Sequence, residues 1–317
     1  MIFKNDKNDL VLKKVCKKSL SKQNYLLLVD VETCNDNKII LDFSYMIISC
    51  KTGLVVERDT FIIKESWETR NIINGIYSKP KKKDYQKMLK ENRATLIDKQ
   101  HLYNKLNKLI KDFGIEIFMA YNGKFDLEAI YNTFDYTNNR TKLWKSKCWR
   151  GGNLKPLFRN LDLLDLWTYA SVYYSTPQFE KWYDTNICEY TKSGNRKTNA
   201  EVMYRYLKEN KLLSETHLAQ EDLDIEYQIF QACVWKRKDK QVVLNYSGLW
   251  GAWRLAQTTP KKRHTKLYEK LVLQKIWDNR GKNHKGYKKH IWKEYHNLLN
   301  IDKVATIRGL QNPLIFL

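Results

Sequence analysis

The feature that most constrains the fold is a succession of three β-rich segments in the first quarter of the chain. Residues 25–31 form an apolar run rich in Leu and Val, which predicts a buried strand. The runs at residues 42–50 and 54–65 are separated by a short glycine-containing loop at residues 51–53, a pattern typical of a hairpin. Together they predict three neighbouring strands, paired in antiparallel fashion.

Helical and strand patterns alternate further along the chain. Residues 84–113 have a helical tendency, with apolar residues on one stripe and a stop at Gly114. The later predictions are a strand at 115–122, a helix at 124–134, a strand passing into a helix at 159–174, a helix at 198–210 with Thr198 as its N-cap, and a helix at 217–235. Strands followed by such alternation predict a mixed α/β sheet covered by helices.

The charge of the chain is strongly positive and unevenly distributed. There are 57 Lys and Arg residues against 35 Asp and Glu, a net charge of +22. Residues 1–24 carry +5 and residues 236–317 carry +14, which leaves +3 for residues 25–235. We therefore expect a basic N-terminal extension, a core domain and a basic, mostly helical C-terminal region. The natural partner of such ends is a polyanion, nucleic acid before an anionic membrane.

The sequence does not support a membrane protein, a secreted protein or a protein with a structural zinc site. No apolar run approaches the roughly 18 residues of a membrane span, and the N-terminus lacks the apolar segment of a secretory signal. The six cysteines are scattered without a C-x-x-C pair, which favours reduced thiols in a cytoplasm over a structural zinc site.

Two acidic residues close the first predicted strand, in the stretch YLLLVDVET. Asp30 and Glu32 are two positions apart, and both should point to one face because side chains alternate across a strand. Two carboxylates on a buried apolar strand are costly unless a cation lies between them. Mg²⁺ and Mn²⁺ accept such oxygen ligands. The alternative is a strand end at which both carboxylates reach solvent.

Further acidic residues stand at the beginnings of two later helices. Asp126 follows a predicted strand and falls in the first turn of a helix, where an acid also suits the positive helix end. In the stretch HLAQED, His217 lies at the helix start, with Thr216 or Ser214 as a cap, and Asp222 lies one turn inside. Imidazole titrates near neutral pH and suits a general base. The alternative is a solvated helix opening.

Taken in order, these motifs resemble those of the DEDDh family of 3′→5′ exonucleases, which includes DnaQ-like proofreading subunits and RNase T. The family motifs are a D-x-E strand, an Asp preceded by Phe with Asn upstream, and H-x4-D. The matching residues, all within 25–235, are Asp30, Glu32, Asn122, Phe125, Asp126, His217 and Asp222. The family often continues D-x-E with Thr-Thr-Gly, whereas Thr33 is followed here by Cys34 and Asn35.

The resemblance implies an RNase H-like fold, a mixed five-stranded sheet flanked by helices. It also implies two Mg²⁺ or Mn²⁺ ions, with His217 as the general base that activates water. The implied metal ligands are Asp30, Glu32, Asp126 and Asp222, and the implied substrate contacts are Thr33, Asn122 and Phe125. The expected function is metal-dependent release of nucleoside monophosphates from the 3′ end of single-stranded nucleic acid, with DNA favoured over RNA. Residues 196–210 are also similar to exonuclease-like proteins of phages, which would place the protein in a host cytoplasm.

Two other functions stay open. One is a catalytically weak or inactive nucleic-acid-binding protein that keeps the fold, in a regulatory or counter-defence role. The other is a proofreading factor that works through a polymerase, with residues 236–317 as its docking element. The complete acid set with His217 favours the enzyme. Residues 236–317 interleave basic residues with Trp and Tyr, which suits either single-strand binding or a helical bundle with Trp in its core. The Lys-, Trp- and Tyr-rich stretch 136–197 is a candidate substrate-facing insertion.

Overall fold

The structure is a computed structural model that describes most of the first 245 residues. The described residues are 3–4, 10–11, 16–34, 38–69, 81–134, 158, 160–174, 176–187, 189–190, 196–210, 212–214, 216–237 and 240–245. They group into two compact units. The first lies within Met1–Leu12, Ser21–Leu163 and Glu215–Asp224, and the second within Lys13–Leu20, Leu164–Ser214 and Ile225–Leu317.

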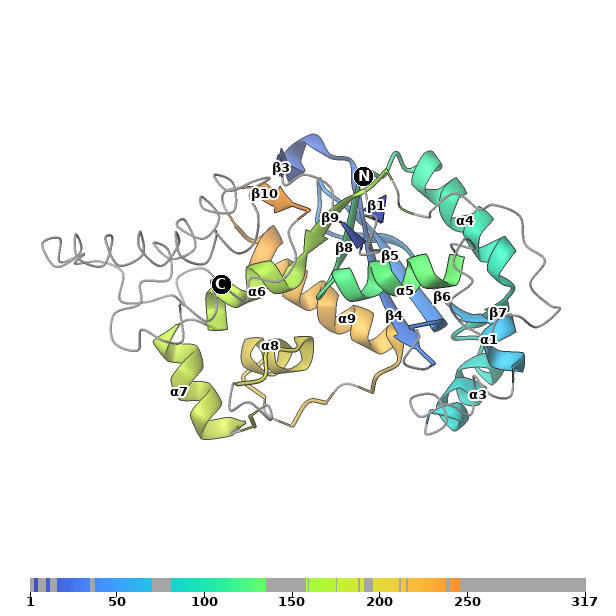
Figure 1. Ribbon diagram of the computed structural model, residues 1–317. Coiled ribbons are helices and arrows are strands. Elements are labelled where there is room, and N and C mark those ends of the chain that lie inside the picture. The colour runs from blue at the N-terminus through green and yellow to red at the C-terminus, as the bar shows by residue number, and fades with distance from the viewer. Residues whose placement is uncertain are drawn as a thin grey trace, which may run out of the picture. The chain divides into compact units, whose positions relative to one another are not determined.

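A six-stranded mixed sheet, in the order β7-β6-β5-β4-β8-β9, organises the fold. Its strands are β4 (Tyr25–Thr33), β5 (Ile40–Ser49), β6 (Val55–Ile63), β7 (Thr95–Ile97), β8 (Ile117–Ala120) and β9 (Asp162–Asp165). β4, β5 and β6 pair antiparallel, as the three β-rich runs predict. β4 lies between β5 and β8 and runs parallel to β8 (Figure 1). Residues Leu26 to Val29 of β4 are all buried, and because successive side chains point to opposite faces, both faces of this strand are covered.

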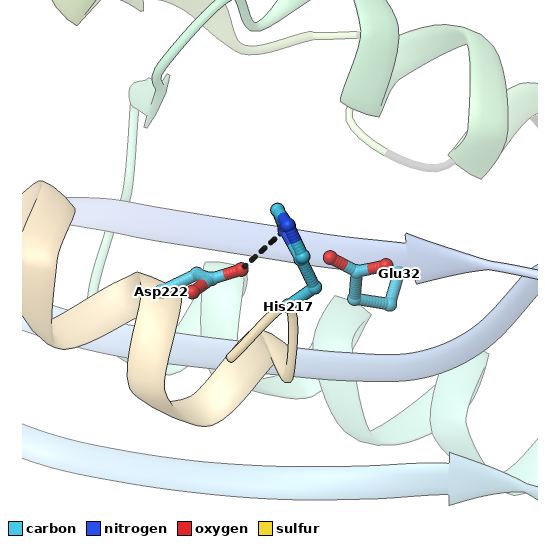
Figure 2. Close-up of side chains that lie close together, drawn as sticks. All are labelled: Glu32, His217 and Asp222. Atoms are coloured by element: carbon cyan, nitrogen blue, oxygen red, sulfur yellow. Dashed lines mark ion pairs between the residues drawn. The ribbon is translucent and has the colours of Figure 1, made fainter. Parts of the chain in front are cut away.

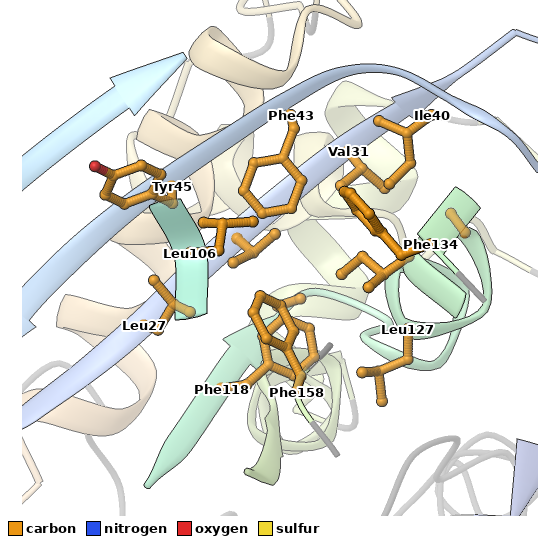
Figure 3. Close-up of a cluster of buried hydrophobic side chains, with 14 of the residues drawn as sticks. Leu27, Val31, Ile40, Phe43, Tyr45, Leu106, Phe118, Leu127, Phe134 and Phe158 are labelled. Carbon is orange, nitrogen blue, oxygen red and sulfur yellow. The ribbon is translucent and has the colours of Figure 1, made fainter. Parts of the chain in front are cut away.

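One face of the sheet carries the main hydrophobic core. Leu27, Val29 and Val31 of β4 belong to it, together with Phe61 of β6. Figure 3 shows Leu27 and Val31 with Phe43 and Phe118 of the neighbouring strands. Helices α4 (Lys99–Asp112) and α5 (Lys124–Phe134) cover this face through residues such as Leu106 and Leu127. Burying a side chain of this size contributes roughly 1.5–3 kcal/mol. This core therefore holds the central strands in a fixed register.

The other face of the same strands is partly polar. Asp30 lies opposite Ser44, and Glu32 lies opposite Asp42, in the antiparallel register of β4 and β5. The Ser44 and Thr60 hydroxyls are 2.9 Å apart and both residues are buried. A second, smaller apolar cluster completes this region; it includes Leu41, Ile62, Tyr85, Met88 and Leu218. The D-x-E carboxylates thus share a face with other buried polar groups and not with the main core.

The sheet differs in one strand from the five-stranded expectation. β7 is the additional strand and pairs parallel with β6. It interrupts residues 84–113, which therefore form two helices, α3 (Lys82–Lys90) and α4, and not one. With only three residues, Thr95 to Ile97, β7 is too short to show the alternation by which strands are recognised.

Helices make up most of the rest of the described chain. They are α1 (Lys64–Glu68), α6 (Leu166–Tyr174), α7 (Pro177–Asn186), α8 (Ala200–Leu207), α9 (Ala219–Phe230), a 3₁₀ turn (Leu20–Lys22) and a π-helical turn (Gln231–Trp235). The residue at the N-cap of α8 is Asn199 and not Thr198 as expected, and no side chain caps that end. None of the described helices is long and apolar enough to cross a membrane.

Short strands lie outside the main sheet. β1 (Phe3–Lys4) pairs with β2 (Leu10–Val11), and β3 (Cys16–Ser19) pairs antiparallel with β10 (Gln241–Leu244). β3 belongs to the stretch expected as an N-terminal extension, and β10 follows residue 236. The division into 1–24, 25–235 and 236–317 stays a prediction, and the aromatic residues Trp250, Trp253, Trp277, Tyr287 and Trp292 lie outside the described residues.

Lys99 provides a test of the packing at the start of α4. Its side chain is buried, with 6% of the residue exposed, and burial lowers its pKa from 10.5 to about 7. Below pH 7 the lysine is charged in both the folded and the unfolded chain, so the folded state bears the full cost of burying a charge. As pH rises from about 7 to 10.5, the folded chain loses this proton first and the cost disappears.

We therefore expect Lys99→Met to raise the free energy of unfolding at pH 6.5, on the order of 3 kcal/mol, and by much less near pH 10. Urea unfolding at the two pH values measures the difference. Lys108→Met, at an exposed position of the same helix, serves as the control. An equal gain at both pH values would contradict the buried-charge explanation.

Candidate metal and catalytic site

Strand β4 delivers the first carboxylates of the site. Asp30 and Glu32 lie on one face near its carboxyl end, and both are half-buried. The pairing with β5 shifts register between Glu32 and Thr33, which is a β-bulge or irregularity directly after the second carboxylate. Bulges of this kind end regular pairing and re-aim side chains next to functional sites. Glu32 is consequently the last β4 residue in the regular ladder.

The histidine and the last acid of the site lie at the N-terminal end of α9. Leu218 is buried in the smaller apolar cluster, so the chain is anchored immediately before the helix. His217 precedes it with a left-handed φ of +55°, and its side chain is 59% exposed. Asp222 lies in the first helical turn, where its backbone N–H donates to the Leu218 carbonyl at 3.0 Å. Because His217 stands outside the helix, the wide angular separation of positions five apart on a helix does not keep it from Asp222.

Glu32, His217 and Asp222 come together at this point. Each offers one ligand atom, and the three atoms all lie within 4.8 Å of one another. The His217 Nδ1 atom is 4.0 Å from Asp222 Oδ2, and the imidazole lies between the two carboxylates (Figure 2). All three residues belong to the first unit. Among the residues that the structure describes, this group is therefore the candidate for holding a metal ion.

Asp30 and Asp126 are not members of that group of ligand atoms. Asp126 lies in the first turn of α5 with 2% of the residue exposed, and α5 follows β8, the parallel neighbour of β4. The carboxyl ends of parallel neighbours meet at one edge of a sheet, so Asp126 emerges at the same edge as Asp30. The structure thus brings three of the five predicted catalytic residues into one group, places Asp30 on the same strand as Glu32, and places Asp126 on the helix that follows the neighbouring strand.

The predicted substrate contacts lie in the turn after β8, in the first turn of α5 and at the end of β4. Asn122 is exposed with a φ of +59°, and its carbonyl accepts the Phe125 N–H at 2.8 Å. The Phe125 ring is half-buried and lies 4.9 Å from the ammonium of Lys38. Thr33 ends β4 and is half-buried. The roles of these three residues stay predictions.

Asp42 is a residue of this region that the sequence patterns did not single out. It is fully buried on β5 opposite Glu32, and its Oδ2 accepts the backbone N–H of Ala219, the first residue of α9, at 3.2 Å. Burial, and then the charge of Glu32, raise the pKa of Asp42 to about 7. The Asp42 side chain on β5 therefore caps the N-terminus of α9, in place of the predicted caps Thr216 or Ser214. The available signal was a carboxylate inside the apolar run ILDFSYMI.

Lys81 is the second residue that sequence reasoning missed. It directly precedes α3, and its ammonium is 2.7 Å from Glu32 Oε2 and 2.5 Å from the carbonyl oxygen of His217. The lysine stands in the run KPKKK, where nothing distinguishes it from lysines on a solvated surface. The candidate site thus contains a cation supplied by the chain itself.

Comparisons with known proteins identify no family. No protein-family model matches the chain, and no curated protein matches it. Among solved structures, similar chains include a 3′-exonuclease with 3′-end specific recognition of the histone mRNA stem-loop, which is 11% identical with a TM-score of 0.39 and covers 76% of this chain and 66% of that chain. Cell-death related nuclease 4 is 12% identical with a TM-score of 0.38 and covers 79% of each chain.

A third similar structure is the zinc-bound complex of E. coli ExoI with single-stranded DNA. It is 15% identical with a TM-score of 0.37 and covers 67% of this chain and 40% of that chain. The chain therefore spans less than two thirds of the length of this structure and of the histone mRNA 3′-exonuclease. All three TM-scores are below 0.5, so these similarities assign no function to this chain.

The cap that Asp42 provides can be tested by substitution. Asp42→Ala removes the acceptor for the Ala219 N–H, and the loss of an N-cap lowers the free energy of unfolding by about 1 kcal/mol, or by up to roughly 2 kcal/mol at a buried position. Asp42→Asn keeps an acceptor oxygen and should lose less. Urea unfolding in metal-free buffer compares the two variants. Equal destabilisation of the two variants would contradict a capping role, because Asp42→Asn retains an acceptor oxygen.

Proposed function

We propose that the chain is a metal-dependent 3′→5′ exonuclease that releases nucleoside monophosphates from single-stranded nucleic acid, with DNA favoured over RNA. The observation that carries the proposal is the convergence of Glu32, His217 and Asp222 on one point from segments about two hundred positions apart in the chain. Three separate motif matches, each ordinary by itself, gain weight because two of them meet in space.

The donor set suits a divalent cation. Two carboxylates and an imidazole are close enough to face a single ion. Asp30 lies on the same strand as Glu32, and Asp126 lies on the helix after the parallel neighbour of that strand. Carboxylate oxygens favour Mg²⁺ and Mn²⁺. The fully buried Asp42 lies opposite Glu32 and adds a further carboxyl group to this region. The accumulation of acids supports the proposal, because such a cluster would repel a phosphodiester unless cations neutralised it.

Each residue of the site would have a distinct role in phosphodiester hydrolysis. Glu32 and Asp222, with Asp30 and Asp126, hold the cations, which when bound stabilise negative charge on the phosphate and favour the ionisation of water. Nδ1 of His217 faces Asp222, which leaves Nε2 to take a proton from the attacking water. Its exposed side chain gives this ring access to solvent and to a substrate phosphate. Thr33, Asn122 and Phe125 are the proposed contacts to the terminal nucleotide.

The positive charge of the chain supports a nucleic-acid substrate. The net charge of +22 lies mainly in residues 1–24 and 236–317, so the acidic site sits in a chain that attracts polyanions overall. A polymerase partner and the docking role of residues 236–317 remain predictions from the sequence.

The proposal is tested with 3′-labelled single-stranded DNA and RNA oligonucleotides incubated with Mg²⁺ or Mn²⁺. We expect release of labelled mononucleotide by the full chain, and loss of about 10²–10⁴-fold in kcat for His217→Ala, the range typical of general-base removal. Mn²⁺ binding by His217→Ala should stay within a few-fold of the parent value, because the carboxylates remain. Asp222→Asn should lose both turnover and metal affinity.

Glu221→Gln is the matched control for Asp222→Asn. Glu221 is the adjacent acid on α9, and its carboxylate lies 3.7 Å from the guanidinium of Arg93, outside the group of three. Its substitution should leave turnover nearly unchanged. If the parent chain released no mononucleotide and behaved like Asp222→Asn, the exonuclease proposal would be wrong. Retained nucleic-acid binding would then favour the non-catalytic alternative.

A further inference from the structure

The ammonium of Lys81 occupies the side of Glu32 that faces the α9 entrance. It contacts Glu32 Oε2 at 2.7 Å and the His217 carbonyl at 2.5 Å, so it links two of the three members of the candidate metal group. Both partners of the ion pair are largely buried, with 17% of the lysine side chain and 21% of the glutamate side chain exposed. This pair differs from an ordinary surface ion pair, which is solvated and weak.

The charges around Lys81 explain why a cation is held there. Glu32 lies opposite the fully buried Asp42 in the register of β4 and β5. Asp222 belongs to the same group of three. Carboxylates this close repel one another in a poorly solvated region, and a positive charge among them relieves the repulsion.

The backbone of Lys81 is fixed even though its side chain is long. Its carbonyl accepts the N–H groups of Asp84 and Tyr85 at 3.0 and 3.1 Å, as the first turn of α3 begins. Tyr85 and Met88 bury α3 in the same apolar cluster that holds Leu218. The ammonium is carried on four methylene groups, so it can move away from Glu32 while α3 stays in place.

The Lys81 ammonium lies 2.7 Å from Glu32 Oε2 and is its ion-pair partner. A divalent cation ligated by the same carboxylate would lie close to this ammonium, and two cations so close in a poorly solvated region repel strongly. We propose that Lys81 is a displaceable counter-cation of the site: it neutralises Glu32 in the metal-free chain, and a divalent metal must displace it to bind. This inference rests on the proposed function, since it assumes that the Glu32 group binds metal.

Because the Lys81 ammonium and the metal compete for Glu32, the apparent metal affinity depends on the fraction of time that the ammonium is away from Glu32. If the lysine is away from Glu32 about one tenth of the time, the apparent dissociation constant is about tenfold weaker than the intrinsic one. Removing the ammonium should therefore tighten metal binding. A lysine that only stabilises the fold, or one that only contacts substrate, would not have this effect.

The test is a titration of the metal-free full chain with Mn²⁺, following free Mn²⁺ by electron paramagnetic resonance, so that no activity is required. Lys81→Met and Lys81→Gln should both bind Mn²⁺ about tenfold more tightly than the parent. Lys81→Arg keeps the competing charge and should bind like the parent. Lys83→Met, an exposed lysine on the same helix, is the matched control and should also bind like the parent.

A thermal readout accompanies the titration. Without metal, Lys81→Met should melt at a lower temperature than the parent, because the acids lose their internal cation, and saturating Mn²⁺ should raise its melting temperature by more than it raises that of the parent.

The outcomes separate the two proposals. If Lys81→Met bound Mn²⁺ no more tightly than the parent while Glu32→Gln weakened binding, Lys81 would not be a counter-cation of the site. The metal site itself would still be supported. No Mn²⁺ binding by the parent or by Lys81→Met would overturn both.

Discussion

A hydrogen bond between residues 177 positions apart joins the sheet to the helix that carries the last acid of the site. The Ala219 N–H at the start of α9 donates to Asp42 Oδ2, which is fully buried on β5 opposite Glu32. The bond fixes where α9 begins, and therefore where His217 and Asp222 lie relative to β4. The positive end of the helix favours the carboxylate, but burial and Glu32 oppose its ionisation. The hydrogen bond that aligns the site therefore requires the carboxyl groups of Asp42 and Glu32 to lie close together.

The accumulation of acids at this point explains two other features of the site. The chain places a lysine against Glu32, and it keeps the acids on the sheet face away from the main apolar core. A separate feature is the backbone of His217, which directly precedes the buried Leu218 and lies in the left-handed region, uncommon for residues other than glycine. Strained backbone of this kind persists where the surrounding packing enforces it, and it concentrates at functional sites.

The sequence was sufficient for the central strands because their signals are local. The run at residues 25–31 and the hairpin that follows are apolar and β-branched, and the structure places β4, β5 and β6 there. The shared face of Asp30 and Glu32 follows from strand periodicity. β7 could not be found, because three residues carry no period. Asp42 and Lys81 were missed because their importance lies in contacts with residues far along the chain, and a lysine in a basic run shows no local sign of a buried partner.

The pairing of β3 with β10 determines where the chain can be divided. β3, residues Cys16–Ser19, is joined along its length to Gln241–Leu244. A chain cut at residue 236, where the charge distribution changes, would lose β10 and leave the backbone groups of β3 without their ladder. Unpaired strand edges recruit other strands and promote aggregation. A shortened protein that ends after residue 245 would keep this ladder while omitting most of the basic region, so any loss of nucleic-acid affinity could then be attributed to the missing charge and not to a damaged sheet.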